Sequence, residues 1–155
     1  MPPRATRDPE LSPRELGAWR GFLRVHAALI RELDAELERE HGLPLTSYEV
    51  LLFLANAPGK RLRMSELADS VLLSRSGLTR LVDRLEGAGL LAREACPSDA
   101  RGSFAVLTDA GTKAFRRAQA THLAGVRARF LDRLSAVDQE RLEALWERLL
   151  EGSET

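Results

Sequence analysis

Guanidinium and hydroxyl side chains gather in residues 74–85, where they share one side of an expected helix. Apolar residues recur in this segment at intervals of three and four, which places them together on the opposite side: Leu78, Leu81, Val82 and Leu85. The polar side carries Ser74, Arg75, Ser76, Thr79, Arg80 and Asp83. Because arginine and hydroxyl groups contact phosphates and base edges, this helix is predicted to bind DNA. The alternative to DNA binding is that this charged face contacts only solvent.

A further arginine, Arg101, stands in a segment that is rich in turn-forming residues. Residues 95–102 contain Pro, Ser, Asp and Gly, and strand-like runs flank them at 90–94 and 103–107. We therefore predict a β-hairpin tip, or wing, with Arg101 near its apex. A slim loop that carries one arginine suits the narrow, electronegative minor groove of A·T-rich DNA. Asp99 either fixes this loop or pairs with Arg101 as a simple surface charge.

The segment before the expected helix of residues 74–85 completes a DNA-binding unit. Residues 64–73 are predicted to form a short helix whose inward side is Leu67, Ala68, Val71 and Leu72. Ser74 can cap the following helix after a tight turn, and Gly89 is placed to end it. Two short helices joined in this way make a helix-turn-helix, to which the hairpin adds a wing.

The stretch from Leu67 to Gly111 resembles the winged helix of MarR-type transcriptional regulators. The most specific similarity is the Asp-x-Arg wing motif of Asp99 and Arg101, followed by Leu107-Thr108 and Gly111, and the resemblance extends over nearly the whole chain. It implies a homodimeric repressor of triangular shape, with a cleft between the dimer helices and the DNA-binding lobe for small, often aromatic, effectors. Many members carry a second basic residue beside the wing arginine, whereas Ala100 and Gly102 flank Arg101 here.

Long amphipathic segments precede and follow this unit. Residues 12–15 read Ser-Pro-Arg-Glu, a capping box that opens a helix ending at Gly42 and Pro44. Residues 46–49 predict a second capping box, which opens an almost wholly apolar helix, and residues 60–63 predict a short strand. After the wing, a helix from Thr108 to about Leu134 is expected to turn inward Phe115, Ala118, Leu123, Val126 and Phe130. A last helix begins near residue 135, so the predicted fold is mainly α with a small β-hairpin wing.

The terminal helices carry more apolar side chains than a small winged helix can cover. We therefore predict one MarR-like domain over residues 1–155, with a helical dimerisation lobe (12–42 and 109–151) and a winged-helix DNA-binding lobe (45–108). A two-fold homodimer would place two DNA-binding helices in successive major grooves, on a pseudo-palindromic operator with half-sites about ten base pairs apart. Arg84, at the edge of its helix face, either contacts DNA or bridges to the dimerisation lobe.

Composition limits the class of protein. The 155 residues are 44% hydrophobic and 30% charged, which is ordinary for a soluble globular protein. The net charge is zero, so DNA binding depends on charge placement: residues 60–102 hold eight Lys and Arg against six Asp and Glu. No apolar run is long enough to span a bilayer and the first residues lack the core of a signal peptide, so the cytoplasm is the expected compartment.

Aromatic residues suggest where a small aromatic or phenolic effector would bind. Trp19, Phe22, His26 and Tyr48 could line a cleft, since aromatic walls with polar tips suit such molecules. The alternative is that Trp19 and Phe22 are core or dimer contacts and that His26 is a buried, hydrogen-bonded histidine. Ordinary capping or surface positions are expected for His41 and His122.

Other chemistries find little support in the sequence. The single cysteine, Cys96, excludes an intrachain disulfide and could sense oxidation, although an unreactive thiol is the preferred interpretation. The three histidines and Cys96 lack metal-site spacing, and no histidine is near Ser74 or Ser76 in sequence, so neither a cofactor nor an enzyme is predicted. A winged helix that binds an acidic protein instead of DNA remains an alternative.

Overall fold

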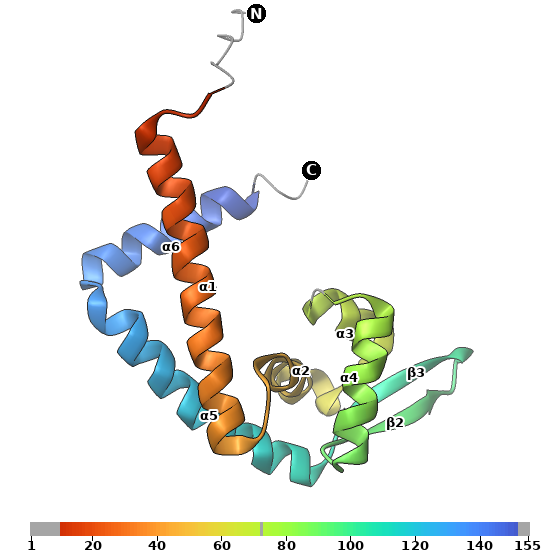
Figure 1. Cartoon of the computed structure of the whole chain (residues 1–155). Helices are drawn as coiled ribbons and strands as arrows, with labels where there is room; N and C mark the ends of the chain where they lie inside the picture. Colours follow the sequence, from red (N-terminus) through yellow and green to blue (C-terminus); the bar gives the residue numbers. More distant parts are fainter. Residues whose placement is uncertain (1–9, 72, 152–155) are drawn as a thin grey trace, which may run out of the picture.

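Six helices and a small antiparallel sheet form the described part of the chain, residues 10–71 and 73–151 of a computed structural model (Figure 1). The predicted fold class is confirmed, whereas Leu72 and the outer limits of the predicted domain lie outside the described residues. The elements in chain order are α1 (Pro13–His41), α2 (Leu45–Asn56), the 3₁₀ turn η1 (Pro58–Lys60), β1 (Arg61–Arg63), α3 (Met64–Val71), α4 (Arg75–Gly87), β2 (Leu91–Cys96), β3 (Asp99–Leu107), α5 (Asp109–Arg129), the 3₁₀ turn η2 (Leu131–Arg133) and α6 (Ala136–Glu151). Strand β3 lies between β1 and β2 in the sheet.

The ends of α1 are set by the residues that the sequence predicted. The Ser12 hydroxyl accepts a hydrogen bond from the Glu15 amide at 3.3 Å, and the Glu15 carboxylate accepts one from the Ser12 amide at 2.9 Å. At the other end Gly42 adopts a φ of 60°, a conformation that costs glycine little, and its amide donates to the carbonyl of Glu38. The capping box and the stop of this helix are confirmed.

The second predicted capping box is wrong, because α2 begins earlier and is capped by another helix. Thr46 and Ser47 lie inside α2, which starts at Leu45. The Leu45 amide donates a hydrogen bond to the Asp34 carboxylate of α1 at 2.7 Å. A carboxylate at a helix N-terminus also interacts favourably with the helix dipole. A contact between two helices therefore replaces the local cap.

The core is one cluster of hydrophobic side chains, mostly aliphatic, to which every helix except α6 contributes among the described residues. In α2, Val50, Leu51 and Leu54 are completely buried. Helix α4 adds the predicted stripe, with exposed fractions of at most 4%: Leu78, Leu81, Val82 and Leu85. Burying one such side chain stabilises a fold by about 1.5–3 kcal/mol. These four residues therefore determine which side of α4 faces solvent.

The wing hairpin is tighter than predicted. Cys96 of β2 pairs with Asp99 of β3, so only Pro97 and Ser98 form the turn, and β3 starts at Asp99. Arg101 is the third residue of β3, two positions after the residue that closes the turn, so it lies on the strand close to the tip and not in the turn itself. The register shifts between Ala95, which pairs with Ser103, and Cys96, which pairs with Asp99. Residues 100–102 therefore form an irregularity within β3 and, contrary to what their composition had indicated, are not part of the turn.

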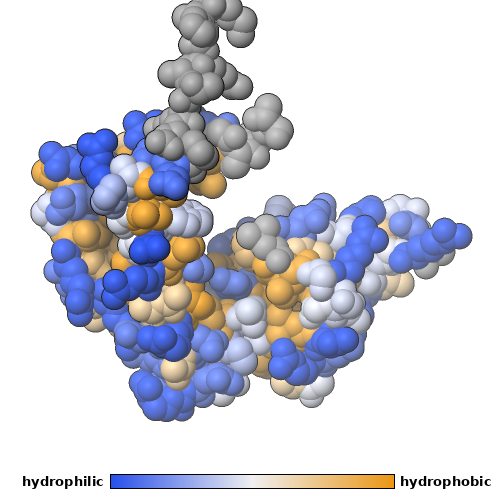
Figure 2. Space-filling model, turned by 45° about the horizontal axis from the view of Figure 1, so that its top comes forward, coloured by the Kyte–Doolittle hydropathy of each residue, from blue (hydrophilic) through white to orange (hydrophobic). Residues whose placement is uncertain are grey.

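The terminal helices expose many apolar side chains. Helix α5 ends at Arg129, earlier than predicted, because Phe130 leaves helical geometry with φ −122° and ψ −63°. Leu123 was predicted to face inward but is 55% exposed. Further large apolar residues of α1 and α6 are exposed: Trp19, Phe22, Leu23, Val25, Ile30, Val137, Leu145, Trp146, Leu149 and Leu150. Figure 2 shows such hydrophobic patches on the helical side of the molecule.

Helices α1 and α5 are joined by polar contacts along their crossing. The guanidinium of Arg129 lies 2.7 Å from the Glu36 carboxylate and 3.1 Å from that of Glu32. Nearer the end of α1, the Nε2 atom of His41 is hydrogen-bonded to the Thr121 hydroxyl at 2.7 Å. These contacts tie the last turns of α1 to α5, beside the start of α2.

His122 lies where α2 meets α5, and its predicted surface or capping position is wrong. Its ring centroid is 4.7 Å from that of Tyr48, whose ring stacks on Phe115 at 5.6 Å. The Nδ1 atom of His122 is buried and has no hydrogen-bond partner among the described residues. A protonated ring would therefore be poorly accommodated at this site.

Acidification is expected to weaken the fold through His122. Burial lowers the pKa of His122 from its ordinary value of 6.5, and the charge of Glu36 opposes this shift. The unfolded chain then binds the proton more readily, so stability is complete above the ordinary pKa and is lost as the pH falls through it. Between about pH 7.5 and about pH 5.5, the urea midpoint should fall more for the wild type than for His122→Leu, at equal protein concentration. An equal fall in both proteins would contradict this assignment.

Candidate nucleic-acid interface

The polar face of α4 is exposed to solvent along its first two turns. Arg75, Ser76, Thr79 and Arg80 all lie on this face. Ser74 caps the helix, since its hydroxyl accepts a hydrogen bond from the Gly77 amide at 3.1 Å. In the part of the chain that the structure describes, neither Arg75 nor Arg80 has an acidic partner. The helix therefore presents two guanidinium groups whose charge is not neutralised.

The hydroxyl groups of this face already make local hydrogen bonds. Thr79 donates to the carbonyl of Arg75 at 2.8 Å, and the hydroxyl oxygens of Ser74 and Ser76 are 3.3 Å apart. A hydroxyl that donates in this way can still accept a hydrogen bond, for example from a base amino group. The two arginines are therefore the stronger candidates for contact with phosphate.

Arg93 of β2 connects the wing to α4. Its guanidinium lies 2.6 Å from the Asp83 carboxylate and 3.0 Å from that of Glu86, and its amide also donates to Glu86 at 2.9 Å. Asp83 was grouped in the sequence with the outward polar residues of the helix. In the structure it is part of this network, which fixes the direction of α4 relative to the strands of the wing.

Thr108 connects the C-terminal end of α4 to the first turn of α5. Its hydroxyl donates to the carbonyl of Gly89 at 2.7 Å and accepts a hydrogen bond from the Gly111 amide at 3.0 Å, while its own amide donates to Leu90. A Cβ atom at Gly111 would overlap the carbonyl oxygen of Leu90, so only glycine permits this close approach. The two helices are therefore joined at their ends.

A hollow of about 370 Å³ lies between the N-terminal ends of α3 and α4 and the wing. Arg75 and Thr79 of α4 line it together with Asp99 and Arg101 of β3, so the structure brings four predicted site residues together. The Asp99 carboxylate accepts a hydrogen bond from the Arg101 amide at 3.0 Å, which fixes the wing backbone beside the arginine.

Arg63 of β1 also lines this hollow, although it was not among the DNA contacts predicted from the sequence. The signal was present in the strand predicted over residues 60–63. Alternate residues of a strand lie on one face, so Arg61 and Arg63 share the side that faces the Phe104 ring, at 4.1 Å and 5.7 Å from its centroid. The two-residue period of a β-strand places Arg61 and Arg63 on the same side of β1, and this would have indicated a cationic surface.

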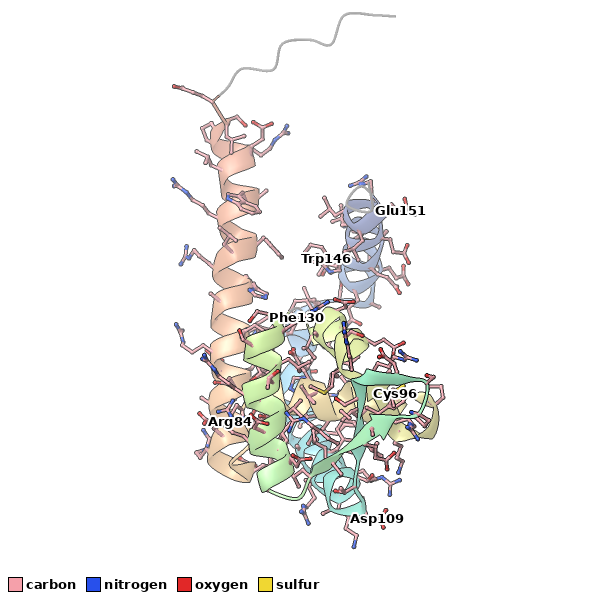
Figure 3. All side chains as sticks on the ribbon, turned by 90° about the vertical axis from the view of Figure 1, so that its right-hand side faces the viewer. Arg84, Cys96, Asp109, Phe130, Trp146 and Glu151 are labelled. Atoms are coloured by element: carbon pink, nitrogen blue, oxygen red, sulfur yellow. The ribbon has the colours of Figure 1, made fainter. Side chains whose placement is uncertain are left out.

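Arg84 lies away from this group of residues. It lines a second groove, of about 860 Å³, together with His41 at the end of α1 and Arg117 of α5. Figure 3 labels Arg84 on the side of α4 that faces α1. Of the two interpretations left open by the sequence, this position favours the one in which Arg84 faces the helical lobe.

The four candidate effector-binding residues fall into two separate groups. Trp19, Phe22 and His26 form a row along α1, with neighbouring ring centroids 6.1 Å apart, and Trp146 of α6 lies 5.8 Å from Phe22. His26 is exposed, so the alternative of a buried, hydrogen-bonded histidine is wrong. Tyr48 is instead buried against α5, with an exposed fraction of 3%. The structure thus brings three of the four rings together and leaves the fourth in the core.

Cys96 is shielded at the base of the wing turn. Its residue exposure is 5%, and its sulfur lies 3.3 Å from the Ser98 hydroxyl (Figure 3). This hydrogen bond lowers the pKa of the Cys96 thiol below its ordinary value, which favours the thiolate. Burial nevertheless keeps the sulfur from a second chain, so an interchain disulfide would require the hairpin to open.

The fold and this exposed face define a winged helix-turn-helix protein of the DNA-binding class. Residues 41–102 match the MarR family. An HTH-type transcriptional repressor of Mycobacterium tuberculosis is 34% identical over 131 residues, which cover 83% of this chain and 91% of the relative. The chain belongs to the MarR family, and it is therefore a DNA-binding transcriptional regulator and not an enzyme.

Solved structures agree with this assignment. A MarR family transcriptional regulator from Streptomyces coelicolor, solved in complex with DNA, is 38% identical and has a TM-score of 0.90, covering 97% of this chain and 94% of that one. AbsC, a MarR family regulator from the same organism, is 37% identical with a TM-score of 0.87, covering 94% and 97%. In the described residues, no helix has the length and apolar character needed to cross a membrane.

Removal of the Arg93 charge is expected to loosen the contact between α4 and the wing. In Arg93→Gln, Asp83 and Glu86 lose their shared cation, and the free energy of unfolding should fall by about 1 kcal/mol, as expected for a partly exposed network. Urea unfolding measures this change. Arg39→Gln is the matched control, because the ion pair of Arg39 in the described part of the chain is an exposed contact with Glu40 at 3.6 Å. Equal stability of the two variants would contradict a positioning role for Arg93.

Proposed function

We propose that this protein is a homodimeric, ligand-responsive repressor that binds a pseudo-palindromic operator in double-stranded DNA. The observation that carries the proposal is the docking of α4, which is held at the surface by four buried aliphatic side chains while Arg75 and Arg80 are exposed. A helix in this position is free to enter a major groove. The wing then lies beside the helix, where it can reach the adjacent minor groove.

The proposed DNA contacts follow from these positions. Ser74, Arg75, Ser76, Thr79 and Arg80 contact the major groove and its phosphates, and Arg101 contacts the minor groove from a wing that Asp99 holds in place. Arg84 faces the other groove, beside His41, and is proposed to serve the contact between the two lobes instead.

The proposed dimer covers the apolar faces of the terminal helices. Residues 12–42 and 109–151 would form the dimerisation lobe, and residues 45–108 the DNA-binding lobe. Exposed apolar side chains on α1, α5 and α6 support this arrangement, because a stable monomer rarely leaves so many exposed together. A two-fold axis through this lobe would repeat α4 about one helical turn of DNA away.

The proposed effector is a small aromatic or phenolic molecule that binds between the helical lobe and the winged helix. Trp19, Phe22 and His26 are exposed on α1, and their rings could pack against such a molecule from the side of the helical lobe, in the part of the row that the dimer does not cover. Effector binding would stabilise a spacing of the two α4 helices that does not fit the operator, so the affinity for DNA would fall. Titration of the DNA complex with aromatic acids and phenols tests this, and retention of DNA throughout would contradict it.

Arginine substitutions on α4 and the wing should weaken DNA binding in different ways. Binding sites are first selected from random double-stranded DNA. Arg80→Ala should weaken binding to the selected site by about 1–3 kcal/mol and relax its base preference, while Arg101→Ala should reduce the preference for A·T-rich minor grooves. Fluorescence anisotropy at fixed salt measures both effects. Arg141→Ala on α6 removes the same charge and is the control.

The outcome also separates two uses of the winged helix. If Arg75→Ala, Arg80→Ala and Arg101→Ala all retain DNA as the control does, the cationic face serves an acidic protein partner and the repressor proposal is wrong.

A charge in the apolar face of α6 should break the dimer. Trp146 is 39% exposed and contacts Phe22, so Trp146→Asp should give a monomer in sedimentation at micromolar concentration and should lose operator binding. Phe53→Asp on α2 is the matched control, because Phe53 is 36% exposed but lies in the DNA-binding lobe. A wild-type protein that sediments as a monomer would exclude the proposed dimer.

A further inference from the structure

Three arginines from three different elements meet at the hollow between α3, α4 and the wing. They are Arg63 of β1, Arg75 of α4 and Arg101 of β3. Within the described ranges, no carboxylate forms an ion pair with any of them. The acidic residue of the lining, Asp99, is engaged by the Arg101 amide. Three positive charges and one negative charge leave the lining with a net charge of plus two.

The neutral residues of the lining add polar groups that suit an oxyanion. Ser65 and Ser103 line the same hollow and carry hydroxyl groups that can donate, whereas the Thr79 hydroxyl already donates to the Arg75 carbonyl. A guanidinium binds phosphate oxygens through two parallel N–H groups, which fixes both position and direction. A hollow of about 370 Å³ that opens to solvent can admit the phosphate of a continuous chain.

Arg63 differs from its neighbour Arg61 in a way that indicates its role. Arg61 lies 4.1 Å above the Phe104 ring and forms an ion pair with Glu94 at 3.5 Å, so its charge is largely balanced. Arg63 lies farther from the ring, and its guanidinium contacts the neutral hydroxyl of Ser98 at 3.5 Å. The wing thus positions Arg63 at the hollow without neutralising it.

We propose that this hollow binds one backbone phosphate of double-stranded DNA and that Arg63 is its principal ligand from β1. The inference rests on the proposed DNA binding by α4 and the wing. The major and minor grooves are separated by a sugar–phosphate strand, so a protein that enters both must straddle that strand. The hollow lies between the two elements that enter the grooves, and the strand must therefore pass over it. Strand β1 becomes a third DNA-contacting element.

The salt dependence of DNA binding tests this assignment. Arg63→Gln should weaken binding about tenfold or more, equally for the selected site and for mixed-sequence DNA. The slope of log affinity against log salt should fall by about 0.9 for each protomer. Arg61→Gln, which changes the same strand, should keep the wild-type slope. Arg63→Lys, which retains the charge, should keep it too, and so should Ser98→Ala, which removes only the contact with the wing.

Replacement of single phosphates by uncharged methylphosphonates identifies the partner atom. At one position in each half-site, between the major and minor grooves, this replacement should lower the affinity of the wild type. It should not lower the affinity of Arg63→Gln any further. If every position costs the two proteins the same, or if Arg63→Gln keeps the wild-type slope, the phosphate site is wrong although DNA binding stands. If the wild type itself selects no sequence and binds DNA without dependence on salt, the proposed function fails instead.

Discussion

The burial of one apolar stripe on α4 is the constraint on which the DNA-binding surface depends. Leu78, Leu81, Val82 and Leu85 belong to the same core cluster as the centre of α2. Together they stabilise the fold by several kcal/mol, a large part of the roughly 5–15 kcal/mol that a domain has in total. Helix α4 therefore cannot leave its position without unfolding the lobe, while its polar side makes no comparable contribution. The exposed residues of α4 are free to serve DNA recognition.

The two ends of α4 differ in their polar contacts. Near its C-terminal half, Arg93 holds Asp83 and Glu86 against β2. At its start, the hollow separates α4 from the wing, and no carboxylate of the described residues forms an ion pair with the arginines there. This difference between the two ends has a physical reason, because an ion pair within the protein fixes the geometry of the segments that it joins. Unpaired cations remain where an anionic partner can complete them.

Local features could be predicted from the sequence, and contacts between distant segments could not. The cap of α1 and the stripe of α4 depend on residues within a few positions of each other, and both predictions were confirmed. The cap of Leu45 depends on Asp34 across a helix-to-helix turn, and the burial of His122 depends on the packing of Tyr48. The turn of the wing is shorter than predicted because composition indicates a turn but does not define strand register.

The junction at Thr108 suggests how the two lobes can influence each other. Thr108 is bonded to Gly89 and Leu90 after α4 and to Gly111 in the first turn of α5, and Gly111 leaves no space between them. A rotation of α5 would therefore move the end of α4 with it, because separating them would break the two hydrogen bonds that Thr108 donates to Gly89 and Leu90. The core around α2 resists continuous deformation, so such a movement would pass between discrete arrangements. In the proposed dimer, the proposed effector would in this way change the spacing of the two α4 helices without touching either one.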